Sequence, residues 1–141
     1  MKRHVLSTLA YMVGTFAVQA TSHFAVNREH YAAVSFLRPE PIFALGVSSM
    51  VLQGAILSYL FAQYVRESPN WRKGLRFGLL AGVFFVSYPA LAEPAKYQVP
   101  AVEHWMAVES VAGLIQFGVF GILLGWIHSR FSPFRTANAN L

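Results

Sequence analysis

The sequence predicts an all-α integral membrane protein, with residues 1–141 folded as one transmembrane four-helix bundle. Hydrophobic residues make up 55% of the chain and charged residues only 12%, against roughly 25% in an ordinary soluble domain. Four apolar runs are each about twenty residues long, which at ~1.5 Å per residue is enough to cross a ~30 Å hydrocarbon layer. Small residues recur every four positions within several runs, a pattern typical of closely packed membrane helices.

The helices are expected at about residues 5–26, 42–65, 74–93 and 105–129. Residues 27–41 between the first two are the longest polar connection, and we expect them to lie at the membrane interface as an amphipathic segment. The first run follows a basic start and could alternatively be a cleaved signal peptide, although it is long for one.

Prolines mark the expected helix ends. Pro39 and Pro41 suit the first turn of the second helix, where a missing N–H costs little. Pro89 is expected to kink or end the third helix because it frees a backbone carbonyl, so the following residues 91–103 are interpreted as an irregular loop. The tail after the fourth helix is short and polar, and we expect it to be frayed.

The positive residues predict the orientation. Eight lysines and arginines fall on one side of the expected spans and three on the other: Lys2, Arg3, Arg66, Arg72, Lys73, Arg76, Arg130 and Arg135 against Arg28, Arg38 and Lys96. By the positive-inside rule both termini are expected to be cytoplasmic. Residues 27–41 and 94–103 then face outward.

Glycines and other small residues indicate where helices approach one another. The candidate packing positions are Gly54, Gly74, Gly78, Gly82, Gly118, Gly121 and Gly125. Those of the second, third and fourth helices fall in their cytoplasmic halves, whereas bulkier and polar residues gather in the outer halves. We therefore expect a bundle that is tight on the inside and looser on the outside.

Weak internal similarity suggests a repeated two-helix hairpin. Gly14 matches Gly82 at an offset of 68 residues, and Gly54 matches Gly118 at an offset of 64. Because each copy would enter the membrane from the same side, the repeat would be parallel rather than inverted.

The polar residues of the outer halves predict an outward-opening cup that could bind a ligand. The candidate ligand-binding residues are Glu109, Glu93, His23, Tyr88 and Gln116, with His30 and His104 at the rim. A pocket between bundle helices with a few convergent polar groups is a recurring kind of ligand site.

Glu109 is the most informative of these residues, because a carboxylate inside a membrane span needs a partner or a wet cavity. A ligand, proton or metal role is one interpretation. The alternative is structural: Glu109 would bridge to Ser22, Tyr88 or Lys96 and fix the register of the bundle.

Catalytic and cofactor signals are weak. The chain has no cysteine, so thiolate chemistry and cysteine-based metal sites are excluded. His23, His30 and His104 are weak metal-ligand candidates, but no Glu-x-x-His pair of the di-iron type occurs. His23 and His128 lie at helix ends, which disfavours haem ligation inside a span. No motif implies a particular cofactor or identifies a catalytic residue.

The second half of the chain shows a glycine-and-aromatic pattern: GLRFGLLAGVFF, then AKYQVP, then W…ES…IQFGVFGILLGWI. Over residues 74–127 this pattern resembles small uncharacterised four-span bacterial inner-membrane proteins. The resemblance implies four helices and a multi-pass location in the bacterial inner membrane. It implies no activity and no site residues.

From the sequence we expect a small non-catalytic membrane protein, an accessory or scaffold subunit of a homo-oligomer or of a larger membrane complex. Its partners would be membrane lipid and either itself or that complex, and no nucleic acid. Two alternatives remain open: an outward-facing protein that binds or transports a ligand or ion through Glu109, and a metal- or quinone-dependent redox protein.

Overall fold

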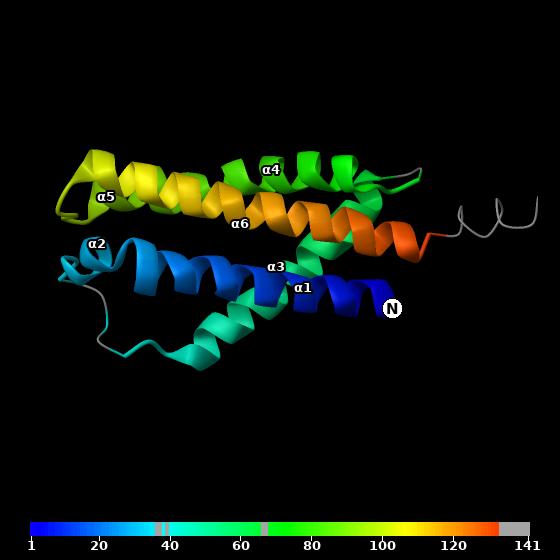
Figure 1. Ribbon diagram of the computed structural model, residues 1–141, viewed down its shortest axis with the longest axis horizontal. Helices are drawn as coiled ribbons and strands as arrows, with labels where there is room; N and C mark the ends of the chain where they lie inside the picture. The colour runs from blue at the N-terminus through cyan, green and yellow to red at the C-terminus, as the bar shows by residue number, and fades with distance from the viewer. Residues whose placement is uncertain (36–37, 39, 66–67, 133–141) are drawn as a thin grey trace, which may run out of the picture.

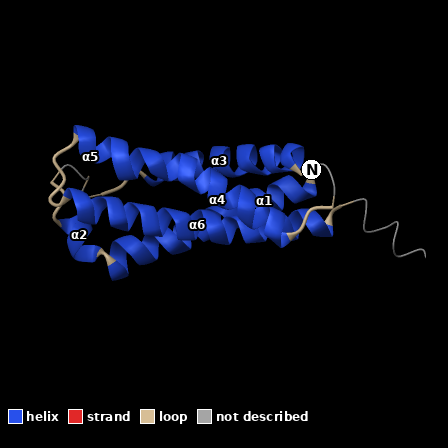
Figure 2. Cartoon of the chain, turned by 90° about the horizontal axis from the view of Figure 1, so that it is seen from above, coloured by secondary structure: helices blue, strands red, loops and turns tan. Residues whose placement is uncertain are grey.

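A computed structural model describes residues 1–35, 38, 40–65 and 68–132. Within that part of the chain every regular element is a helix, as Figure 2 shows. The predictions made for Pro39, for Arg66 and for the tail from residue 133 onward lie outside the described residues.

The chain forms four long helices, with shorter turns at the ends of two of them. Their bounds are α1 Lys2–Thr21, η1 Ser22–Val26, α2 Arg28–Ala32, α3 Phe43–Tyr64, α4 Trp71–Ser87, η2 Tyr88–Ala92, α5 Glu93–Lys96 and α6 Val102–Arg130. The two η elements are wider π turns. The element order of the first half, a long helix, a π turn, a short helix and a second long helix, is the same in the second half.

The third helix does not end at Pro89 but continues through η2 and α5 to Lys96. Pro89 and Pro94 lie near the start of η2 and of α5, inside a helix that runs without a break from Trp71 to Lys96, so each removes one helical N–H donor. The backbone oxygen of Pro89 accepts a hydrogen bond from the indole Nε1 of Trp105 at 2.8 Å. The segment from residue 91, expected to be an irregular loop, is therefore helical over its first six residues.

Three helices are long and apolar enough to cross a membrane: Phe43–Tyr64, Trp71–Lys96 and Val102–Arg130. The structure is thus that of a multi-pass membrane protein. The helix α1 is 20 residues long but does not meet the same criterion. It begins with Lys2 and Arg3 and carries a series of polar residues along its length.

The helix α6 lies between α1 and α4 (Figure 1). The short helices α2 and α5 lie at one end of the bundle, and the N-terminus and the end of α6 lie at the other (Figure 1). We call the first the outer end and the second the inner end, after the predicted orientation. The helix α3 is inclined to the others and crosses them (Figure 1).

The closest helix contact joins the backbones of α4 and α6. A Cβ placed on Gly78 would lie 2.7 Å from the Cα of Gly121, and one placed on Gly74 would lie 2.7 Å from the Cα of Gly125. No side chain fits at such distances, so glycine is required on both helices. The opposite case is Gly118, where the nearest atoms to a Cβ are leucine side chains at 3.8 Å.

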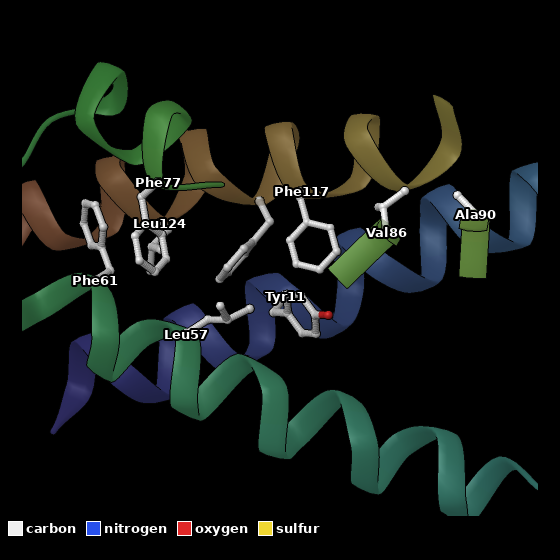
Figure 3. Close-up of a cluster of buried hydrophobic side chains, with 9 residues drawn as sticks. Tyr11, Leu57, Phe61, Phe77, Val86, Ala90, Phe117 and Leu124 are labelled. Atoms are coloured by element: carbon white, nitrogen blue, oxygen red, sulfur yellow. The ribbon is translucent and has the colours of Figure 1, made fainter. Parts of the chain in front are cut away.

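A row of apolar side chains fills the interior along the bundle axis (Figure 3). Its members are Tyr11, Leu57, Phe61, Phe77, Val86, Ala90, Phe117, Phe120 and Leu124. Phe120 packs edge-on against Tyr11, with ring centroids 4.8 Å apart. The hydroxyl of Tyr11 points along the row toward Val86, in the outer direction (Figure 3).

The helix α3 contributes to this core only through its second half. Its buried residues are Gly54, Leu57, Ser58 and Phe61, whereas every residue from Phe43 to Ser49 is exposed. The outer half of α3 therefore lies away from the bundle, in agreement with the predicted looser packing on the outside. The polar interior next to it is left partly open.

Replacing Gly78 by alanine should separate α4 from α6. We expect Gly78→Ala to have a free energy of unfolding about 1–3 kcal/mol below that of Gly118→Ala, the cost of overpacking a close contact. Both substitutions replace glycine by alanine and so raise helix propensity equally. The difference between their free energies of unfolding therefore reports the contact of Gly78 with α6. The measurement is reversible unfolding in mixed micelles, followed by circular dichroism. Equal stabilities of the two variants would contradict the close approach.

Candidate functional site

The helix α1 turns a polar face toward the interior of the bundle. Ser7, Tyr11, Thr15, Gln19 and Ser22 follow one another at spacings of three or four residues, which places them along one side of a helix. Ser7, Tyr11 and Ser22 are buried. Inside an apolar medium such groups must be paired by other helices or by water, so this face indicates where polar partners of α3 and α6 gather.

At the outer end, Tyr31 of α2 covers Glu109 of α6. Tyr31 is only 8% exposed, and its hydroxyl donates a hydrogen bond to Glu109 Oε1 at 2.7 Å. The ring of His23 stacks on Tyr31 with centroids 3.6 Å apart. Burial, and secondly the bond to the carboxylate, raise the pKa of Tyr31, so the phenol remains a proton donor at any physiological pH.

The sequence predicts Glu93 and Tyr88 as further members of the ligand site. In the structure only Glu93 lies close to Glu109. Glu93 is close enough to Glu109 for the two negative charges to act on each other. Tyr88 is exposed, and Lys96 Nζ lies over its ring at 5.1 Å. The hydrogen-bond partner of Glu109 is thus Tyr31, a residue that the sequence did not indicate, rather than one of the three partners expected for a structural bridge.

About two turns further along α6 from Glu109, a set of side-chain hydrogen bonds joins α1 to α6. Gln19 Nε2 donates to Gln116 Oε1 at 2.7 Å, and Gln116 Nε2 donates to Thr15 Oγ1 at 2.9 Å. Gln116 is only 5% exposed. His23 Nδ1 lies 3.0 Å from the backbone oxygen of Gln19. His23, Gln116 and Glu109 of the predicted site are therefore linked through Gln19 and Tyr31.

These groups surround a small chamber of about 160 Å³ between the four long helices. It is lined by Tyr11, Gln19, Gln53, Phe85, Val86, Pro89, Glu109, Gly113, Gln116 and Phe117. The hydroxyl of Tyr11 donates to Gln53 Oε1 at the inner side of the chamber. A water molecule needs roughly 10–15 Å³ of such space together with polar partners, so the chamber can hold several waters.

Larger hollows lie outside the bundle. One of about 580 Å³ runs between α1–η1 and the outer half of α6, with mostly apolar lining such as Val18, Val111 and Ile115. Val111 and Ile115 are more than half exposed. Its position on the flank of two helices and its mostly apolar lining suit a lipid chain.

The rim histidines belong to an aromatic cluster at the outer end. The ring of His30 lies 4.8 Å from that of His104 and 5.3 Å from that of Trp105. Within the part of the chain that the structure describes, no three histidine or carboxylate side chains lie close enough to hold a metal ion together. Among the same residues, the buried Nε2 of His30 has no hydrogen-bond partner.

A second polar cluster, which sequence reasoning missed, lies at the inner end. His4 Nδ1 is 2.9 Å from Ser58 Oγ, and Ser58 Oγ is 3.1 Å from His128 Nε2. His128 is only 2% exposed. A signal was present, because both termini were predicted on one side, which places the start of the first helix beside the end of the fourth. His128 was instead interpreted as a residue of a helix end.

Comparison with protein-family models, with curated proteins and with solved structures finds no match to this chain. The function is therefore inferred from the geometry of these groups.

The pH dependence of stability should report the burial of His30 on helix α2, the helix that carries Tyr31. Burial, and secondly the charge of His104, lower the pKa of His30 below its ordinary value of 6.5. Between the lowered pKa and 6.5 the unfolded chain binds more protons than the folded chain, so stability falls as the pH drops through this interval. We expect His30→Gln to lose less thermal stability than the unsubstituted protein between about pH 7 and about pH 5. Equal losses in micelle melting curves would contradict this assignment.

Proposed function

We propose that this protein binds and exchanges protons from the outer side of a bacterial inner membrane, with Glu109 as the group that takes up the proton. It would belong to the ion-binding or transport class rather than to the enzymes. The observation that carries the proposal is the hydrogen bond from Tyr31 to Glu109 beside a polar chamber inside the bundle. Carboxylates in such a position are rare and are commonly part of proton or ion pathways.

The surroundings of Glu109 suit reversible protonation. Glu93 lies close enough to Glu109 for two ionised carboxylates to repel each other. Tyr31 donates to the carboxylate and stabilises its charged form, while the chamber offers water as the carrier of the proton. Tyr31 lies on the short helix α2, so a small movement of this helix would uncover the carboxylate.

This function requires a defined topology, which we propose as four spans with both termini in the cytoplasm. The fourth span would be α1, whose contacts with α6 extend from His4 beside His128 to Gln19 beside Gln116. Its polar residues face other helices rather than lipid, which explains its low hydropathy. The repeated element order of the two halves supports a parallel duplication of one hairpin.

Infrared spectroscopy tests the role of Glu109 directly. In difference spectra between high and low pH, we expect a protonated-carboxyl band that shifts in D₂O and is absent from Glu109→Gln. The matched control is Glu103→Gln, which removes the same charge from an exposed position on the same helix. A band retained in Glu109→Gln would show that another carboxylate binds the proton.

A second variant reports on the hydrogen bond. Tyr31→Phe removes the donor, so we expect the band to remain but to move in frequency, with Tyr59→Phe, an exposed tyrosine, unchanged from the unsubstituted protein.

The accessory or scaffold function remains a second proposal, but it must rest on a different surface. Gly74, Gly78 and Gly121 are occupied by contacts within the chain, so they cannot receive a partner. The exposed outer half of α3 could do so, and a Cβ on Gly46 would meet nothing within 4 Å. Because the protein lacks cysteine, single cysteines can be introduced cleanly. In native membranes, Gly46→Cys should crosslink to a second polypeptide far more than Val83→Cys on the exposed face of α4. Equal yields would remove this support.

A further inference from the structure

The cluster at the inner end has defined hydrogen-bond directions. Arg3 Nε lies 3.3 Å from His4 Nε2, and arginine can only donate, so His4 Nε2 must accept. A neutral His4 then carries its proton on Nδ1 and donates it to Ser58 Oγ, 2.9 Å away. Ser58 has one proton left to give, and His128 Nε2 at 3.1 Å receives it. The hydrogen bonds therefore run in one direction, from Arg3 to His4, from His4 to Ser58 and from Ser58 to His128.

A hydroxyl that accepts from one imidazole and donates to another has the geometry needed to relay a proton. When Arg3 releases His4 and a proton binds Nε2, the ring becomes an imidazolium. Its Nδ1–H bond then breaks as a new O–H bond forms on Ser58, and the original Ser58 proton passes to His128 Nε2. The products are neutral His4, intact Ser58 and protonated His128, so one charge has moved from a half-buried residue to a fully buried one.

Ser7 lies between the relay and the outer chamber. It is completely buried, and its hydroxyl has no hydrogen-bond partner among the described residues. It lies on the inward face of α1, about 4.5 Å along the axis from His4 and about 6 Å from Tyr11 at helical rise. A buried hydroxyl in this state calls for an ordered water. Water at Ser7 would join the relay to Tyr11 and Gln53, which border the chamber of Glu109.

We propose that His4, Ser58 and His128 form the inner port of a proton path, whose outer port is Glu109, so that the bundle conducts protons along its axis. This inference rests on the proposed function of Glu109 and extends it from binding at one side to passage between the two sides.

Purified protein in liposomes tests the path. A potassium diffusion potential set with valinomycin drives protons inward, and an enclosed pH-sensitive dye records their entry. We expect flux above that of empty liposomes for the unsubstituted protein, and at least tenfold less for Ser58→Ala. The matched control is Ser129→Ala, a half-buried serine near the same end of the bundle whose hydroxyl donates to the backbone oxygen of Trp126; this variant should conduct normally. Ser58→Thr retains the hydroxyl and should conduct.

Because Ser58 is buried, misfolding of Ser58→Ala would also reduce the flux. A second variant therefore tests the relay at a less buried residue. His4→Gln changes a half-buried residue and removes the entry group, so its flux should fall as well. Flux through Ser58→Ala and His4→Gln equal to that of the unsubstituted protein would overturn the relay, as would no flux at all above empty liposomes. The infrared experiment separates these failures from failure of the outer site. If the carboxyl band disappears in Glu109→Gln, proton binding at Glu109 is supported even without flux; if the band persists in Glu109→Gln, proton binding at Glu109 is contradicted.

Discussion

The backbone contact between α4 and α6 is the interaction on which the rest of the bundle depends. Gly74 and Gly78 of α4 lie directly against Gly121 and Gly125 of α6, and no other residue type fits. This contact occupies one face of α6. The neighbouring face, which carries Glu109 and Gln116, is left for other elements, and α1 with its extension α2 covers it.

The composition of α1 follows from that arrangement. A helix that covers a carboxylate, an amide and an imidazole must itself supply hydrogen-bonding groups, because each buried group left unpaired costs about 1–3 kcal/mol. Thr15 and Gln19 meet Gln116, and His4 meets His128 through Ser58. The result is a helix of 20 residues that does not meet the criterion of length and apolarity met by the three candidate spans.

Local patterns in the sequence predicted much of the fold. Apolar runs and four-residue glycine spacing depend on neighbours along one helix, so the helices and the glycine face of α4 could be anticipated. The carboxylate Glu109 also stood out, because charge within an apolar run is conspicuous. Its partner Tyr31 did not, since that contact depends on how a connecting segment folds back over the end of the bundle.

The inner cluster and the inclination of α3 escaped prediction for a related reason. His4, Ser58 and His128 come from three helices, and each looks ordinary beside its neighbours in sequence. The inner half of α3 packs against α1, where Gly54 contacts Thr8 and Tyr11. The buried residues of α3 all lie between Gly54 and Phe61, so its outer half diverges from the bundle. Only the assembled structure shows either feature.

The pairing of α1 with α6 has a consequence for biosynthesis. Thr15 and its partner Gln116 are separated by 101 residues, which take the ribosome about 5–20 s at about 5–20 residues per second. During that interval the amides and hydroxyls of α1 have none of their final partners on α6. Until the last helix is made, the polar face of α1 can pair only with α3, through Tyr11 with Gln53 and His4 with Ser58.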